Sequence, residues 1–355
     1  MTFRYLTIIR SPTAQLLEIL NDNIIGTPGQ GMRYQHLGMN EKINQIEDPY
    51  FVNLVRAGKI AGTCCFCSRD TLNNGQNIHA FYVRYFSFID SFRRKSIKEK
   101  ATSGNSGLRK EIESLLSGEG LNVNPGEKFF HYAYVDPRNE RSALLCEEFG
   151  FEPVRQYASI IFSRLNPKLN RKDRIVEATS AESVQELLKN FYHGFNTLSF
   201  ENLSTKKYYF MEDEKGQIVA GVHANPDQWK IHSLPGFIGN TMLLVFTKIP
   251  ILNRLLHEKF RFLTFEGIYL VTGNEKYLER LFETLLAKYN VNSAICIVDT
   301  GSKLYTTIKS LRLGLMNKLN KEVLGNVICR FVNFSQESKN TFKTNPVYIS
   351  GIDAT

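Results

Sequence analysis

The sequence has 355 residues, a net charge of +9, 43% hydrophobic residues and 22% charged residues. This composition is that of a folded globular protein and excludes a disordered chain, and the length suits two domains of ordinary size. The positive charge fits either a polyanionic partner or a cofactor that carries phosphates. Because the basic residues are scattered and form no stripe interleaved with aromatic residues, we expect no nucleic-acid partner.

Neither the N-terminus nor the most apolar segment predicts export or a membrane span. The N-terminal residues lack an apolar core followed by a small-residue cleavage site, and segment 236–256 is interrupted by charged residues and a proline. We therefore expect a cytoplasmic protein with reduced thiols. Cys64 and Cys65 would face opposite sides of a strand, and no second ligand pair follows Cys67 at zinc spacing. We expect these cysteines to pack in the core and predict no metal site.

The first half of the chain shows strand and helix signals in a defined order. A hairpin is predicted over Tyr50–Phe66, with its turn at Ala57 and Gly58. A long aromatic strand, an amphipathic helix, a strand ending in Val-Asp, a second helix and a hydrophobic strand follow. Their positions are the strand His79–Ile89, the helix through Leu108–Leu116, the strand Phe129–Val135, the helix before Phe149 and the strand near Arg155–Phe162.

The second half repeats this order. A hairpin is predicted over Tyr208–Ala224, with its turn at Glu214–Gly216. The elements after it are the strand Phe262–Val271, the helix Leu278–Leu286, the strand Ser293–Val298, which again ends in Val-Asp, and the strand near Val327–Phe334. A final strand is predicted over Asn345–Ile352, in position to cross back to the first domain.

The repeat predicts two α/β domains in tandem, each with a mixed, mostly antiparallel central sheet and flanking helices. The polar, proline-containing segment Asn166–Asp173 suits a linker. We therefore expect domains over residues 1–168 and 173–355, with the second completing a shared sheet or walling the acceptor cleft.

One segment carries a resemblance to a known family. Val135–Phe151 (VDPRNERSALLCEEFGF) is similar to the GNAT acetyltransferase superfamily, where a strand precedes an Asn that opens a helix and a Gly-Phe follows that helix. Upstream, Phe88–Lys95 resembles the strand end and the start of the phosphate loop in that family, with Arg93 where the family places Arg or Gln. The resemblance spans Leu6–Leu165 and continues more loosely over Arg174–Phe334.

The resemblance implies two GNAT-like domains and an acyl-CoA site, for acetyl-CoA in the simplest case, in the first of them. A helix N-terminus offers free N–H groups and a positive dipole end to the pyrophosphate, and basic side chains add charge-assisted contacts. The expected cofactor-binding residues are Phe88, Arg93, Arg94, Lys95, Gly104, Asn105, Ser106, Gly107 and Asn139. The insertion 96–102 makes this loop longer than is usual in the family. Without the resemblance, a flexible surface loop would explain the same residues equally well.

Two candidate catalytic residues follow from the chemistry of amide formation. In the family, a tyrosine seven residues after the Asn often protonates the departing thiolate, and Cys146 occupies that position here. A cysteine thiol can donate a proton, but cysteine is also a common core residue. His79 is a candidate base for the amine, and a lone histidine beside a strand is also a common surface residue.

Tyrosines on the two central strands complete the predicted site. Tyr85 is a third catalytic candidate and is expected on the strand face opposite Tyr82. Tyr132 and Tyr134 share a face of the next strand and either line the acceptor pocket or pack in the core. In the second half, Glu266 is the one strand carboxylate that we assign to the substrate side.

Together these features predict an N-acyltransferase that moves an acyl group, acetyl in the first instance, from acyl-CoA to a primary amine. No Cys–His pair suggests an acyl-enzyme, so we expect direct attack in a ternary complex. The acceptor would be a small molecule, an amino acid or a peptide. The alternatives are a transferase that uses a longer acyl or an aminoacyl donor, and a catalytically silent binding module with the same fold.

Overall fold

The computed structural model describes residues 3–26, 28–29, 31–88, 107–170, 172–203, 207–234, 241, 248–249, 253–319 and 322–354. The strands are β1 Leu6–Ile9, β2 Arg33–His36, β3 Pro49–Arg56, β4 Lys59–Asn73, β5 Gln76–Phe88, β6 Phe129–Val135, β7 Glu152–Ser163, β8 Arg174–Glu177, β9 Tyr208–Glu212, β10 Ile218–Ser233, β11 Lys259–Leu270, β12 Ser293–Asp299 and β13 Val323–Val332. The helices are α1 Ala14–Asn21, α2 Met39–Asn44, α4 Gly107–Leu116, α5 Glu140–Glu148, α6 Ala181–Phe191, α9 Glu275–Lys288, α10 Lys303–Ser310, α11 Leu315–Leu319, α12 Gln336–Thr344 and α13 Gly351–Ala354. None of the helices in these ranges is both long and apolar enough to span a bilayer.

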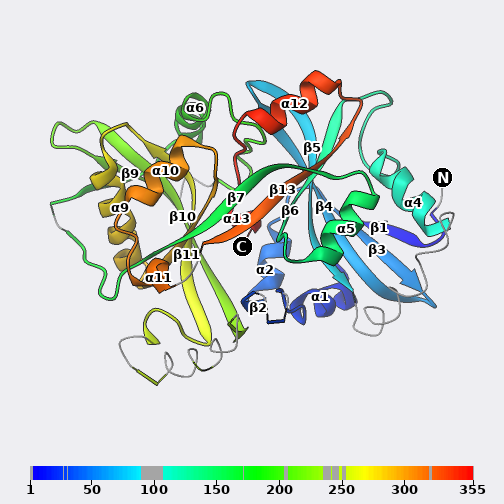
Figure 1. The fold of residues 1–355 in the computed structure, drawn as a ribbon, viewed down its shortest axis with the longest axis horizontal. Helices are drawn as coiled ribbons and strands as arrows, with labels where there is room; N and C mark the ends of the chain where they lie inside the picture. Colours follow the sequence, from blue (N-terminus) through cyan, green and yellow to red (C-terminus); the bar gives the residue numbers. More distant parts are fainter. Residues whose placement is uncertain are drawn as a thin grey trace.

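All the strands belong to one mixed, mostly antiparallel sheet of 13 strands that runs through both halves of the molecule (Figure 1). The order is β1-β3-β4-β5-β6-β13-β7-β12-β11-β10-β9-β8, with β2 paired to β10. We call the elements from β1 to β7 the N-terminal half and those from β8 to α13 the C-terminal half. The sequence prediction of an α/β protein with two repeated, mostly antiparallel units is therefore confirmed.

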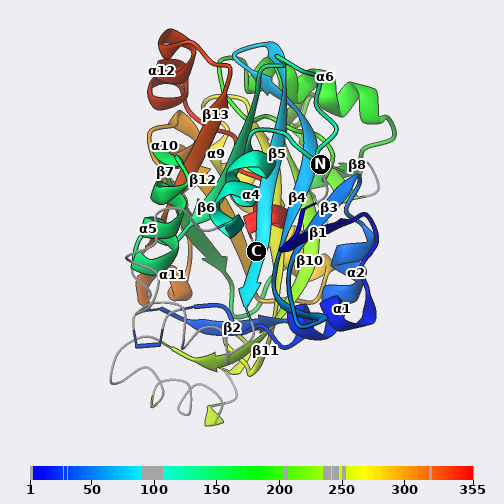
Figure 2. The same cartoon turned by 90° about the vertical axis from the view of Figure 1, so that its right-hand side faces the viewer.

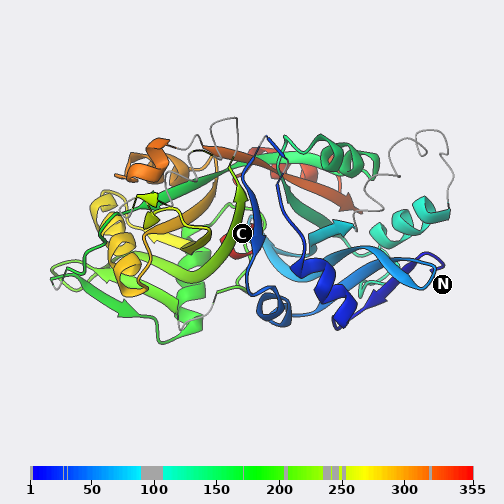
Figure 3. The ribbon, with the colours of Figure 1, turned by 90° about the horizontal axis from the view of Figure 1, so that it is seen from below.

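Helices cover both faces of the N-terminal half. In Figure 3, α4 and α5 lie on one side of its strands, and α1 and α2 lie on the other. Figure 2, which faces this half, shows β5 between β4 and β6. The predicted amphipathic helices form as expected: α4 buries Leu115 and Leu116, and α9 buries a full stripe that includes Leu278, Phe282 and Leu285.

The last strand of each half lies next to strands of the other half. Strand β7 pairs with β12 from Ser163 opposite Ser293 to Tyr157 opposite Asp299. Strand β13 pairs with both β6 and β7 and so completes the sheet of the N-terminal half. As a result, Phe162 of β7 is fully buried in a core built mostly by the C-terminal half, 5.4 Å from the ring of Phe282. The predicted division at residues 168–173 stays a prediction about the chain, because packing crosses it.

A second crossing comes from the N-terminal segment. Strand β2 pairs with β10 of the C-terminal half, with His36 opposite Trp229. Beside this pairing, Lys42 of α2 donates to Asp227 of β10 at 2.6 Å and lies 3.3 Å from His36 Nδ1. Burial lowers the pKa of the Lys42 ammonium, and the Asp227 carboxylate opposes that shift. The contact holds the two halves together on the face opposite α4 and α5.

The predicted packing of Cys64, Cys65 and Cys67 in the core is confirmed. Cys65 and Cys67 are fully buried on one face of β4, with their sulfur atoms 3.8 Å apart, and Cys64 packs against the hydrophobic cluster on the other face. Within the described ranges, no three histidine, cysteine, aspartate or glutamate side chains gather as a metal site requires.

The predicted final strand over Asn345–Ile352 is wrong, although the predicted crossing to the first domain occurs. The segment forms a single bridge, between Val347 and Asn196, and then enters α13. Pro346 has no N–H to donate to a ladder, and the side chains of both halves bind the remaining polar groups. The segment ends at the centre of the molecule, between the two halves (Figure 1).

A core truncation tests the exchange of strands. Phe162→Ala should lower the free energy of unfolding by about 3–5 kcal/mol, because a buried ring shared by both halves leaves a cavity. Unfolding should remain one transition when followed by circular dichroism and by fluorescence, since neither half completes its sheet alone. Leu169→Ala is the control, because that side chain is 63% exposed, and should change the free energy by less than about 0.5 kcal/mol. Two well-separated transitions in the unmodified protein would contradict the shared sheet.

Candidate active site

The two central strands of the N-terminal half separate partway along their length. Parallel pairing between β5 and β6 runs from His79 opposite Phe129 to Tyr82 opposite Tyr132 and ends there. We call the region between the two strands beyond this point the first strand opening. The GNAT resemblance implies that the acyl-pantetheine arm enters such an opening.

Tyr85 distorts β5 at the first strand opening. Its φ of 58° is in the left-handed region, and the β4–β5 register shifts at this point. The distortion breaks the strand alternation, so the Tyr85 ring packs on the same cluster as Tyr82, whereas the sequence predicted opposite faces. A non-glycine residue in this conformation costs on the order of 1–3 kcal/mol, and such residues concentrate at functional sites.

The Tyr85 hydroxyl is buried and has no hydrogen-bond partner among the described residues. Burial raises the pKa of this phenol to about 12, and the nearby Arg84 opposes the shift. The Arg84 guanidinium lies 4.2 Å from the centre of the Tyr85 ring. The hydroxyl therefore stays protonated at neutral pH and is free to donate to a ligand.

A buried ionic cluster supports the strand that carries Tyr85. Asp353 of α13 accepts hydrogen bonds from Arg69 of β4 and Arg84 of β5, each at 3.1 Å, and its backbone carbonyl accepts the Tyr82 hydroxyl at 2.8 Å. Arg69 also pairs with Glu201. The C-terminal helix is thereby fixed beside the first strand opening.

The tyrosines predicted for the acceptor pocket lie on this side of the sheet. The rings of Tyr132 and Tyr134 lie 5.2 Å and 5.1 Å from the ring of Tyr82. Tyr132 is 2% exposed and packs in the core, whereas Tyr134 is half-buried and accepts the backbone N–H of Ser350 at 3.3 Å. Burial raises the pKa of both phenols, which therefore remain neutral.

The other two catalytic candidates lie away from Tyr85. His79 is at the opposite end of β5, about 20 Å along the strand by its rise per residue, and contacts Ser68 and Glu127. Cys146 lies on α5, whose end packs through Phe149 on the face opposite Tyr132. Burial raises the pKa of the Cys146 thiol to about 11. His79 therefore lies far from the strand opening, and Cys146 has no contact with Tyr85 among the described residues.

The predicted cofactor-binding residues are described only in part. Gly107 begins α4, as expected for a loop that leads into a helix, and its Cα lies against Tyr5, where a Cβ would approach the ring to 3.0 Å. Asn139 is the N-cap of α5 and accepts the N–H of Ser142 at 3.3 Å, which confirms that it opens the helix. Outside the described residues lie Arg93, Arg94, Lys95, Gly104, Asn105, Ser106 and the side chain of Phe88.

Glu266 is buried on β11, and its contacts are with the C-terminal segment of the same chain. It accepts hydrogen bonds from Tyr348 Oη at 3.1 Å, from Ser350 Oγ at 3.0 Å and from the backbone N–H of Ile352 at 3.0 Å. Burial raises the pKa of the Glu266 carboxyl to about 7, and the Ile352 and Ser350 hydrogen bonds limit the rise.

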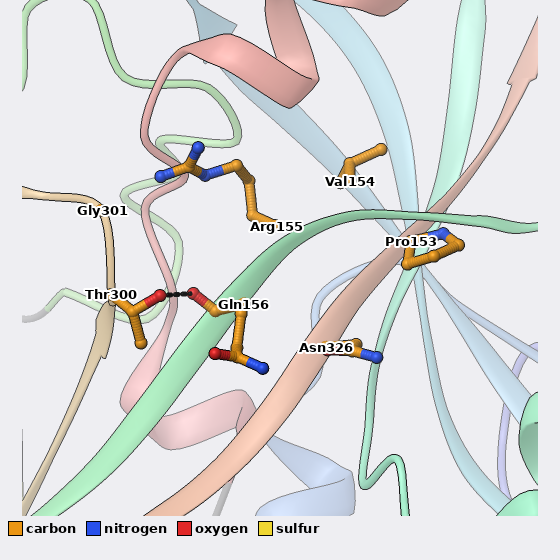
Figure 4. A pocket seen from close by; sticks show the side chains of 7 residues that line it. All are labelled: Pro153, Val154, Arg155, Gln156, Thr300, Gly301 and Asn326. Atoms are coloured by element: carbon orange, nitrogen blue, oxygen red, sulfur yellow. Dashed lines mark hydrogen bonds between the residues drawn. The ribbon is translucent and has the colours of Figure 1, made fainter.

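An open cavity of about 440 Å³ lies elsewhere, where β7, β13 and the loop after β12 meet (Figure 4). Arg155, the one cation among the described residues that line it, makes two hydrogen bonds to Asp299 and one to the backbone carbonyl of Lys343. The Thr300 hydroxyl donates to the Gln156 carbonyl. Arg155, Thr300 and Gln156 are already paired with one another or with neighbouring groups, and the pairing with Asp299 raises the pKa of Arg155, which keeps it a fixed cation. We therefore do not place the site here.

The buried charged residues that support the strand opening were not predicted from the sequence. Arg69 and Arg84 interrupt the apolar pattern of β4 and β5, and a charge at a core position of a strand is a signal of a buried ion pair. Their partner Asp353 has no such signal, because it lies in a short polar tail and reaches Arg69 across 284 positions of the chain.

Comparison with known proteins gives the fold class. No protein-family model matches the chain, and no curated protein matches it in sequence. N-myristoyltransferase of Saccharomyces cerevisiae, solved with bound myristoyl-CoA, is similar in structure with a TM-score of 0.58 and 11% identity, over 99% of this chain and 90% of that one. A probable N-acyltransferase from Enterococcus faecalis has a TM-score of 0.47 and 11% identity, over 92% of this chain and 73% of that one. The chain has the GNAT fold in a tandem arrangement.

Glu266→Gln tests the raised pKa of the buried carboxyl. Between about pH 4.5 and 7 the folded protein binds more protons here than the unfolded chain, so the free energy of unfolding falls as the pH rises. The loss approaches about 3 kcal/mol across this window. Because glutamine does not titrate, the difference between the unmodified protein and Glu266→Gln should shrink or reverse sign with rising pH in urea titrations. Glu214→Gln, in an exposed turn, should give parallel curves, and parallel curves for Glu266→Gln would contradict the assignment.

Proposed function

We propose that this protein is an N-acyltransferase that moves an acyl group from acyl-CoA to a primary amine at the first strand opening. The observation that carries the proposal is the separation of β5 and β6 next to a strained tyrosine whose buried hydroxyl lacks a partner among the described residues. The similarity in fold to a transferase solved with an acyl-CoA supports the same class of chemistry.

Tyr85 has the chemistry needed to assist the departing thiolate. In direct attack, the neutral amine nitrogen bonds to the thioester carbon, the carbonyl becomes an oxyanion, and the C–S bond then breaks. The sulfur leaves with the electron pair of that bond and needs a proton. With a pKa of about 12, the Tyr85 phenol is protonated at neutral pH, so it can donate a hydrogen bond and then its proton to the departing sulfur. It regains a proton when the new amide nitrogen loses its extra one. We assign this step to Tyr85 rather than to Cys146.

A short acyl group, acetyl in the first instance, fits this arrangement best. The paired part of β5 ends at Tyr82, three residues before Tyr85, or about 10 Å of strand. The buried rings of Tyr82 and Tyr132 fill the closed end. The amine acceptor, a small molecule or a peptide N-terminus, would approach along the side lined by the half-buried Tyr134.

The phosphate contacts remain a prediction from the sequence. We propose that the N-terminus of α4, which begins at Gly107, receives the pyrophosphate and that Arg93, Arg94 and Lys95 add charge. Asn139 already caps α5, so we propose that it shapes the loop beside the cofactor and does not bind it directly.

Ligand binding tests the cofactor assignment. A ligand that binds only the folded state stabilises it by about 2.7 kcal/mol at about 100 times its Kd. We therefore expect acetyl-CoA to raise the thermal unfolding midpoint, and octanoyl-CoA and myristoyl-CoA to raise it less. Adenosine is the control and should leave the midpoint unchanged. An unchanged midpoint with every acyl-CoA would exclude the cofactor.

A pair of variants tests the proton donor. Tyr85→Phe should lower kcat roughly 10²–10⁴-fold with little change in KM for acyl-CoA, because only the proton transfer is lost. Cys146→Ala is the matched variant and should retain its activity. Release of free thiol over a panel of primary amines measures both. Full activity in Tyr85→Phe together with loss in Cys146→Ala would reverse the assignment. Acyl-CoA binding without turnover of any amine would favour a binding module.

A further inference from the structure

The C-terminal half repeats the strand opening of the N-terminal half. Parallel pairing between β11 and β12 runs only from Leu263 opposite Ala294 to Phe265 opposite Cys296. Two residues later, Gly267 has a φ of 58°, the same left-handed value as Tyr85, and the β10–β11 register shifts beside it. We call the region between β11 and β12 beyond Phe265 the second strand opening.

A peptide segment of the same chain occupies the second strand opening through its backbone. The N–H of Val347 donates to Asp299 Oδ2 at 3.0 Å, and the N–H of Tyr348 donates to the Asn196 carbonyl at 2.8 Å. In return, the Asn196 N–H donates to the Pro346 carbonyl at 2.9 Å, and the Thr197 hydroxyl donates to the Tyr348 carbonyl at 2.7 Å. These contacts are those of an extended peptide bound by main-chain recognition.

The side chains of the segment fill the space between the strands. Val347 and Ile349 are 1% and 5% exposed, and the Tyr348 ring lies 5.1 Å from the ring of Tyr192. The Tyr348 hydroxyl donates to Glu266 at the edge of the opening. A cavity of only about 20 Å³ remains between the segment and the strands, which is room for about one water molecule.

We propose that the second strand opening is a binding site for an extended peptide, and that residues 345–350 of this chain are its resident ligand. The site is built like the first opening but is closed to a cofactor by the segment that fills it. One chain therefore binds one acyl-CoA. The proposal rests on the proposed function only for what enters the first opening, since the geometry of the second is independent of it.

The bound segment also fixes the position of one wall of the first strand opening. At the end of the segment, the Ser350 N–H donates to the Tyr134 hydroxyl, and just beyond it Asp353 accepts hydrogen bonds from Tyr82 and Arg84. The residues that hold the segment in the C-terminal half therefore determine where α13 meets β5, next to Tyr85. Release of the segment from the second opening should loosen the wall of the first.

Hydrogen exchange on the full chain tests the resident ligand. In the unmodified protein, the amides of residues 347–352 should be protected, and Tyr348→Ala should raise their exchange rates at least tenfold. Tyr289→Ala removes a partly buried tyrosine of the same half that does not contact the segment, and should leave these rates unchanged. Tyr348→Phe, which loses one hydrogen bond and keeps the ring, is the milder variant and should raise the rates about fivefold.

Binding in trans tests the ligand class. A fluorescent peptide with the sequence of residues 345–355 should not bind the unmodified protein, where the site is filled, and should bind Tyr348→Ala. The same peptide with alanine at the tyrosine position should bind neither protein. Unprotected amides in the unmodified protein, or a released segment that no peptide replaces, would overturn the proposal.

Counting bound acyl-CoA by native mass spectrometry separates this proposal from the proposed function. One acyl-CoA per chain supports both. Two would show that the second opening takes a cofactor and would overturn the resident ligand. None would remove the proposed function, while the exchange and peptide experiments would still decide the resident ligand.

Discussion

The contact between the Asp353 carboxylate and the guanidinium groups of Arg69 and Arg84 joins the C-terminal helix α13 to strands β4 and β5 of the N-terminal half. Burial alone would lower the pKa of Arg69, but Asp353, Tyr132, Glu201 and Cys67 together outweigh burial and raise it, so the cation stays charged inside the protein. An arginine left in the core without this carboxylate would cost about 3–5 kcal/mol. The contact therefore ties the C-terminal helix to β4 and β5 and fixes Tyr82 and Arg84, the neighbours of Tyr85 on β5.

Three sets of contacts between the two repeated halves join them into one body. Strands β7 and β13 each complete the sheet of the opposite half, β2 pairs with β10, and the C-terminal segment connects the two strand openings. The first two sets use ladder hydrogen bonds, to which the second adds the Lys42–Asp227 ion pair, and the third uses the buried carboxylates Glu266 and Asp353. A site between the halves is thus held by contacts from both, which limits the freedom of its walls.

Turns, helix caps and amphipathic helices were predictable from the sequence, because residues a few positions apart specify them. The turn at Ala57 and Gly58, the apolar stripe of α9 and the Asn139 cap each depend on neighbours a few residues away, and the structure has all three. The exchange of β7 and β13 was not predictable, because a hydrophobic pattern marks a segment as a strand without specifying which distant strand it will pair with. The left-handed backbone at Tyr85 was hidden as well, since tyrosine gives no sign of it, whereas glycine at position 267 does.

The exchange of strands also bears on how the chain folds during synthesis. Strand β6 lies near residue 130, but its neighbour β13 ends at Val332, so the sheet of the N-terminal half keeps an open edge until β13 has been synthesised. An unpaired apolar edge of this kind is a template for aggregation. The nascent protein therefore depends on slow, long-range closure, and chaperone supply during translation should govern how much of it reaches the native state.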